Sequence, residues 1–279
     1  MRQNLQLRII TALIGIPVTV LLVVLGGWAL FALAAVVAVV ASMEFTALLR
    51  GRCSKQPPFL GALLTLILLG LTQWSAPWSW YLWWVALAAA SHVFHHWLRG
   101  EKGWHTMGRC TLSSLAGVVY VGLPILAMLH LREAGDSGAF WLILVLILTW
   151  ATDSFSYLAG RVFGNRLLAP RISPKKTIEG ALGGWLGGSV AGYVALQLSG
   201  QYAVIYLPLI LFAPPVAVFG DLWESAMKRY FQSKDSRLAG FNLFPGHGGV
   251  LDRIDALLFV APTVVLYFMA TRTVLVAGI

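Results

Sequence analysis

Charged side chains are scarce in this sequence. Asp, Glu, Lys and Arg together make up 11% of its 279 residues, whereas a soluble domain carries about 25%. Hydrophobic residues account for 58%, and the mean hydropathy is +0.78. Cysteine is scarce too, because Cys53 and Cys110 are the only two. The composition excludes a soluble enzyme, and two cysteines exclude a disulfide framework, so we expect both thiols to be buried or inert.

Several functional patterns are also missing. The chain has no Walker A phosphate loop and no zinc-type Cys/His spacing. It has no internal repeat, and so lacks the sequence symmetry of many transporters. The longest stretches outside apolar segments are residues 161–179 and 221–253. Any chemistry must therefore belong to these two loops and the helix ends that lead into them.

Apolar runs of roughly 20 residues recur along the whole chain, each long enough to cross a bilayer as a helix. They predict an all-α, polytopic integral membrane protein with about nine transmembrane helices. The predicted spans are residues 9–26, 28–49, 58–73, 77–97, 110–131, 139–160, 180–199, 202–220 and 254–276. We treat residues 1–279 as a single membrane domain. Its N-terminal part, 1–135, is less characteristic than the catalytic half, 139–279.

Basic residues lie almost entirely on one side of this pattern. Of the 20 Lys and Arg residues, only Arg132 and Arg272 fall in loops of the opposite side. Because basic loops stay in the cytoplasm, we expect a cytoplasmic N-terminus and an active site at cytoplasmic helix ends. The net charge of +9 should attract anionic lipid headgroups and nucleotides there. The lack of a targeting extension favours a bacterial inner membrane.

The stretch 221–255 combines three features of phosphate chemistry. Carboxylates bind Mg²⁺, basic side chains bind phosphate, and glycine lets backbone N–H groups approach an anion. The charged residues are Asp221, Glu224, Lys228, Arg229, Lys234, Asp235, Arg237, Asp252, Arg253 and Asp255, and the glycine-rich loop is Pro245-Gly246-His247-Gly248-Gly249.

The spacing within this stretch predicts two acidic helix ends. Asp221, Glu224, Ser225 and Lys228 follow i, i+3, i+4, i+7 spacing, which places them on one helical face. Ordinary ion pairing of the acidic residues with their basic neighbours is the alternative to a metal site.

Asp252 and Asp255 are likewise three residues apart, at the start of the last predicted span. Mg²⁺ usually takes one or two carboxylates besides phosphate oxygens and water, so the two helix ends predict a Mg²⁺ site. His247, between glycines, would contact phosphate or protonate a leaving group; a plain turn is the alternative.

The segment 150–180 supplies the second set of candidates. Asp153 falls inside a predicted span, where an acidic residue is costly and is a functional hypothesis by default. Ser173 followed by Pro174 predicts a helix N-cap with proline at the first helical position. Lys175, Lys176 and Thr177 would then occupy a first turn whose free N–H groups favour an anion. Topology-setting positive charge is the alternative reading of the lysines.

Two ordered blocks of this sequence resemble the CDP-diacylglycerol synthase (phosphatidate cytidylyltransferase) family. One is WATDSFSYLAGRVFGNRLLAPRISPKKTIEG, and the other carries ESAMKR, KD, PGHGG and LDRID in that order. The resemblance is close over about 150–258 and looser through RIITAL and the YVGLP run. One departure lies between Asp235 and Pro245, where the chain is a few residues longer than the family pattern. Arg237 also stands where a small residue is expected, which weakens the assignment of Lys234 and Asp235.

The resemblance implies that CTP condenses with phosphatidic acid to give CDP-diacylglycerol and pyrophosphate, with Mg²⁺ required. The lipid phosphate would attack the α-phosphorus of CTP in line. The expected partners are CTP, phosphatidic acid and anionic membrane lipid, with no nucleic acid; a homodimer is left open. We assign catalysis to Asp221, Asp252, His247 and Lys175, with Asp221 and Asp252 as metal ligands. The substrate-binding candidates are Ser173, Lys176, Thr177, Asp153, Glu224, Ser225, Lys228, Arg229, Lys234, Asp235, Gly246, Gly248, Gly249, Arg253 and Asp255.

Two other functions stay open at this stage. A CDP-alcohol phosphotransferase would use the same lipid nucleotide, but it normally carries a DGxxAR-type run that this sequence lacks. A transporter of anionic solutes would place charges near the middle of several spans, whereas most acidic residues here lie at one face.

Overall fold

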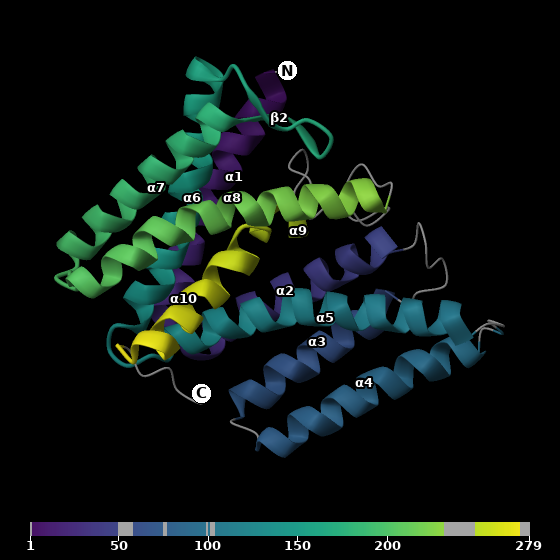
Figure 1. Ribbon diagram of the computed structural model, residues 1–279. Coiled ribbons are helices and arrows are strands. Elements are labelled where there is room, and N and C mark those ends of the chain that lie inside the picture. Colours follow the sequence, from purple (N-terminus) through teal and green to yellow (C-terminus); the bar gives the residue numbers. More distant parts are fainter. Residues whose placement is uncertain are drawn as a thin grey trace. The chain divides into compact units, whose positions relative to one another are not determined.

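The computed structural model describes residues 2–49, 58–74, 77–98, 100, 104–231 and 249–273, and within them the chain is overwhelmingly helical (Figure 1). Within these ranges, each of the nine predicted apolar segments overlaps a helix. The helices are α1 (Arg2–Leu25), α2 (Gly27–Leu49), α3 (Pro58–Gln73), α4 (Trp78–Leu98), α5 (Trp104–Arg132), α6 (Gly138–Phe163), α7 (Ile178–Leu198), η1 (Val204–Tyr206), α8 (Leu207–Tyr230), α9 (Leu251–Ile254) and α10 (Leu257–Thr271).

Four helical segments in the described ranges are long and apolar enough to cross a membrane. They are Gly27–Leu49, Gly108–Arg132, Gly138–Phe163 and Val204–Tyr230. Three shorter apolar helices, Leu13–Leu25, Phe59–Gln73 and Leu257–Thr271, accompany them. The expectation of a helical integral membrane protein is therefore confirmed.

The chain forms two compact units. The first comprises Met1–Leu126 and Tyr230–Arg253, and the second comprises Ala127–Arg229 and Ile254–Ile279. In the first unit, α3, α4 and α5 enclose a core of Leu64, Leu68, Trp84, Ala88 and Val118. The Trp84 indole N–H donates to the Leu64 carbonyl at 2.8 Å, which satisfies its polar atom inside this apolar core.

Cys110 lies in the same unit and is 1% exposed. The expectation of burial is confirmed, but the expectation of a free thiol is wrong, because Cys110 is disulfide-bonded. The other cysteine, Cys53, lies outside the described residues.

In the second unit, α7 packs closely against α6 along a stripe of small residues. Glycines recur every four residues at Gly180, Gly184, Gly188 and Gly192, the spacing that lets two membrane helices approach. A Cβ atom at Gly184 would lie 2.7 Å from the Thr152 carbonyl oxygen, which is too close for any side chain.

The other helices of this unit complete its core. The Trp185 indole N–H donates to the Leu211 carbonyl of α8 at 2.9 Å. The rings of Trp141, Tyr206 and Phe268 pack against one another, with the Trp141 centroid 4.9 Å from Tyr206 and 4.8 Å from Phe268.

The predicted helix start at Ser173 is wrong. Residues Leu167–Ala169 and Ser173–Thr177 form β1 and β2, an antiparallel hairpin that is the exception to the all-α prediction in the described chain. A residue before proline prefers an extended conformation, so Ser173-Pro174 suits a strand as well as a cap. Thr177 is the actual N-cap of α7, and its hydroxyl accepts a hydrogen bond from the Gly180 N–H at 3.1 Å.

Candidate active site

The acidic end of α8 carries the predicted helical face. Asp221, Glu224, Ser225 and Lys228 all lie within this one helix, despite the Pro214-Pro215 pair earlier in it. Glu224 is 1% exposed, and the Lys228 ammonium lies 3.3 Å from its carboxylate. A carboxylate this deeply buried needs a nearby positive charge, which Lys228 supplies from the next turn.

The β1–β2 hairpin lies beside the last turns of α8 (Figure 1). The Lys176 ammonium forms an ion pair with the Asp221 carboxylate. The Arg229 side chain donates through Nε to the Ile172 carbonyl at 3.3 Å. These two contacts bring the hairpin and the end of α8 together within the second unit.

The two lysines of the hairpin differ in their surroundings. Successive residues of a strand point to opposite faces, so Lys175 and Lys176 diverge. Lys176 is half-buried against Asp221, whereas Lys175 is exposed. Thr177 is committed to capping α7, and Ser173 is half-buried in β2.

Glu179, which the sequence analysis did not select, holds the hairpin to the start of α7. Its Oε2 accepts hydrogen bonds from the backbone N–H groups of Asn165 at 3.1 Å and Arg166 at 3.2 Å. Hydrogen bonds from its own backbone N–H and from those of Asn165 and Arg166 lower the pKa of Glu179. The sequence offered one signal for Glu179, because acidic residues are favoured in the first turn of a helix.

Asp255 adds a third carboxylate to this cluster. A Cβ atom at Gly220 would lie 2.9 Å from the Asp255 carbonyl oxygen, so the glycine lets α8 approach closely. Asp255 lies between α9 and α10, ahead of the last apolar helix, and is 8% exposed. The Asp255 carboxylate is thus shielded from solvent, and the negative charge of Asp221 repels it. A cation at this cluster would relieve that repulsion.

Asp252 lies in the first unit, at the second position of the short helix α9. Its Oδ2 accepts a hydrogen bond from the Gly249 N–H at 3.2 Å. The next two backbone N–H groups, of Val250 and Leu251, donate to the Glu44 carboxylate at 3.0 and 2.7 Å. Glu44 was missed, although an acidic residue inside the predicted span 28–49 was a signal of the kind that selected Asp153.

The remaining predicted residues fall in two groups. On the exposed surface of the described chain are Asp153 on α6, Arg229 on α8 and Arg253 on α9. Outside the described residues lie Lys234, Asp235, Gly246, His247 and Gly248, whose roles stay predictions.

A sequence model of the cytidylyltransferase family matches residues 6–271. This chain belongs to the cytidylyltransferase family. The predicted class of enzyme, a nucleotidyltransferase, is therefore confirmed.

Relatives of this chain are named for the predicted reaction. A phosphatidate cytidylyltransferase of Bacillus subtilis is 38% identical over 154 residues, 54% of this chain and 55% of that protein. One of Thermotoga maritima is 41% identical over 140 residues, 48% of this chain and 50% of that protein. These two matches span about half of each relative. One of Staphylococcus aureus (strain COL) is 30% identical over 259 residues, 92% of this chain and 96% of that protein.

The carboxylate side chains described above are suitable ligands for Mg²⁺. Carboxylate oxygens are the hard ligands that Mg²⁺ prefers, and one or two of them suffice when phosphate oxygens and water complete the octahedron. Among the residues that the structure describes, no group of three or more His, Cys, Asp or Glu residues is arranged to enclose a metal ion.

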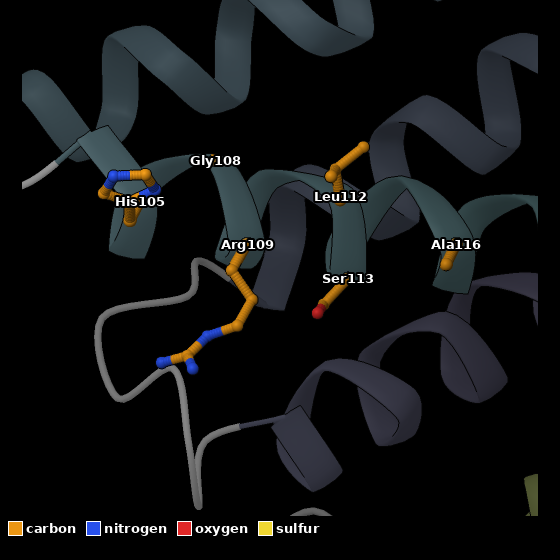
Figure 2. Close-up of a pocket in the computed structure, with 6 residues that line it drawn as sticks. All are labelled: His105, Gly108, Arg109, Leu112, Ser113 and Ala116. Carbon is orange, nitrogen blue, oxygen red and sulfur yellow. The ribbon is translucent and has the colours of Figure 1, made fainter.

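A pocket of about 590 Å³ lies elsewhere, on the first half of α5. Its described lining consists of His105, Gly108, Arg109, Leu112, Ser113 and Ala116. Figure 2 shows Arg109 and Ser113 projecting from the same side of the helix. None of the predicted site residues belongs to the described lining of this pocket.

Proposed function

We propose that this chain is a phosphatidate cytidylyltransferase. A phosphate oxygen of phosphatidic acid attacks the α-phosphorus of CTP, the bond to the β-phosphate oxygen breaks, and pyrophosphate leaves as CDP-diacylglycerol forms. The observation that carries the proposal is the Lys176–Asp221 ion pair, which joins the SPKKT block to the acidic end of α8. Family membership and the names of the relatives support the same reaction.

The proposed roles follow from charge. Lys176 and Lys175 bind phosphate oxygens, and Lys228 and Arg229 add positive charge at the same helix end. These contacts would accelerate the reaction mainly by positioning the substrates and neutralising charge as pyrophosphate departs.

The metal is assigned to Asp221 and Asp252. The assignment of Asp221 draws on the carboxylate cluster, and that of Asp252 on its place in the LDRID block. Mg²⁺, when bound, supplies charge neutralisation to the triphosphate. His247 would contact a phosphate or protonate the departing group.

The membrane arrangement is part of the proposal. Nine spans, with the N-terminus in the cytoplasm, put loops 161–179 and 221–253 on the cytoplasmic face of a bacterial inner membrane. Phosphatidic acid presents its phosphate at that surface, and soluble CTP reaches it from the same side. The charge asymmetry of the sequence supports this orientation.

The test is direct. Purified protein is incubated with phosphatidic acid, Mg²⁺ and CTP labelled in the cytosine ring, and the organic phase is examined for a labelled lipid. The proposal expects a product that requires all three components. A CDP-alcohol phosphotransferase, which needs CDP-diacylglycerol and an alcohol, would form no labelled lipid from these components, and neither would a transporter; the absence of labelled lipid contradicts the proposal.

A further inference from the structure

Glu44 makes a contact that links α2 to a segment more than 200 residues away. Its Oε1 accepts a hydrogen bond from the Val250 N–H at 3.0 Å, and its Oε2 accepts one from the Leu251 N–H at 2.7 Å. The sequence separation is 206 residues for the first bond. Both oxygens of one carboxylate therefore hold two consecutive backbone N–H groups, directly before Asp252.

The environment of Glu44 makes this contact costly to maintain. The residue is 4% exposed and lies in Gly27–Leu49, a helix long and apolar enough to cross a membrane. A buried carboxylate is unfavourable unless strong hydrogen bonds compensate it, and charge-assisted bonds from backbone N–H groups are of that kind. An apolar residue would serve packing alone at lower cost.

The segment that Glu44 holds also restrains the Asp252 side chain. Asp252 accepts a hydrogen bond from Gly249, and the Arg253 N–H donates to the Val250 carbonyl at 2.9 Å. Fixing the backbone at Val250 and Leu251 therefore limits the directions in which the Asp252 carboxylate can point.

We propose that Glu44 is a positioning residue for Asp252. By fixing the peptide groups of Val250 and Leu251 it orients the Asp252 carboxylate for a divalent cation, without touching substrate or metal itself. This inference rests on the metal role proposed for Asp252. Residues that orient metal ligands in this way typically change metal affinity or activity about 10–100-fold when substituted.

The experiment compares Glu44→Gln and Glu44→Ala with Ser42→Ala in the full-length protein. Ser42 is a matched control, because it is buried in the same helix but hydrogen-bonds to Thr65 at 2.9 Å instead of the 249–252 segment. Gln keeps one carbonyl acceptor and Ala keeps none, so we expect a smaller loss of activity in Glu44→Gln than in Glu44→Ala. The readouts are kcat, the KM for CTP, the Mg²⁺ concentration for half-maximal rate, and hydrogen exchange of the Val250 and Leu251 amides.

We expect Glu44→Gln to raise the Mg²⁺ concentration for half-maximal rate and to lower kcat. The product of these two fold-changes should be roughly tenfold. The KM for CTP at saturating Mg²⁺ should stay near the wild-type value, and the two amides should exchange faster. Ser42→Ala should leave all of these unchanged. The purified variants must show the same thermal unfolding as Ser42→Ala; if Glu44→Ala does not fold, Glu44→Gln decides.

Two results overturn the inference. One is faster amide exchange in Glu44→Gln with unchanged Mg²⁺ dependence and kcat, because the contact then has no positioning role. The other is unchanged exchange, because the contact is then absent. Asp252→Asn separates this from the proposed function: wild-type activity in that variant removes the metal role of Asp252, whatever the exchange at Val250 and Leu251.

Discussion

The Lys176 ammonium pairs with the Asp221 carboxylate and so joins the β1–β2 hairpin to the end of α8. The pair assigns different roles to two lysines that are adjacent in sequence. Lys176 is half-buried and fixed beside the carboxylate cluster, whereas Lys175 is exposed on the opposite face of the strand.

Substitution of these lysines should therefore give unequal effects. Lys176→Met removes both the proposed phosphate ligand and the partner of Asp221, so we expect kcat to fall by roughly tenfold or more. Lys175→Met should mainly raise the KM for one substrate, and Lys176→Arg should keep part of the activity because the charge remains. Steady-state kinetics with CTP and phosphatidic acid varied separately measure these effects. Wild-type kinetics in both Met variants would mean that the two lysines only set the membrane topology and do not bind substrate.

Glu179 predicts a pH dependence of stability. Its hydrogen bonds lower its folded-state pKa below the ordinary value of a glutamate, so the folded state binds the proton less tightly than the unfolded state. The stabilisation is complete above the unfolded pKa and is lost as the pH falls through the folded pKa. Thermal unfolding of Glu179→Gln should thus occur at a lower temperature than wild type at pH 7, and this gap should close as the pH falls through the folded-state pKa of Glu179. A gap of equal size at neutral and at acidic pH contradicts this account.

The α6–α7 contact predicts a packing cost. Gly184→Val places a Cβ atom 2.7 Å from the Thr152 carbonyl oxygen and against the Ser156 side chain. Overpacking of this kind costs about 1–3 kcal/mol, which should lower the unfolding temperature in detergent. Val190→Leu on the same helix is the control, because Val190 is 62% exposed. Equal unfolding temperatures for the two variants would mean that the helices separate more readily than the glycine spacing implies.

Topology can be measured independently of activity. In a background lacking Cys53 and Cys110, Asn165→Cys and Ser233→Cys should react with an impermeant maleimide from the cytoplasmic side alone. Ser137→Cys should react from outside alone. Labelling of positions 165 and 233 from opposite faces would place the two loops on different sides of the membrane and exclude a shared site.

The apolar runs predicted the helices well, because a span of about 20 apolar residues has few other ways to satisfy its backbone. The i, i+3, i+4, i+7 spacing correctly placed Asp221, Glu224 and Lys228 on one helix, since that pattern depends on local geometry alone. The N-cap at Ser173 was wrong because Ser-Pro is compatible with both a cap and a strand, and the choice depends on pairing with Leu167–Ala169.

Long-range contacts were beyond the sequence pattern. The sequence around Glu44 does not predict that its partners are the N–H groups of Val250 and Leu251, over 200 residues later. The burial of Asp255 likewise depends on the close approach of α8 at Gly220. Such features require the packed structure, because they arise between segments that no periodicity connects.

The most direct test of the central claim follows the phosphorus atoms of CTP. Purified protein is given phosphatidic acid, Mg²⁺ and CTP labelled with ³²P at either the α or the γ position, and lipid and aqueous phases are counted. Cytidylyl transfer predicts that the α label enters the lipid while the γ label appears in pyrophosphate, and that Asp221→Asn and Asp252→Asn abolish both while Asp136→Asn does not. Transfer of the γ label to lipid, or lipid labelling by Asp221→Asn at the wild-type rate, would contradict the account.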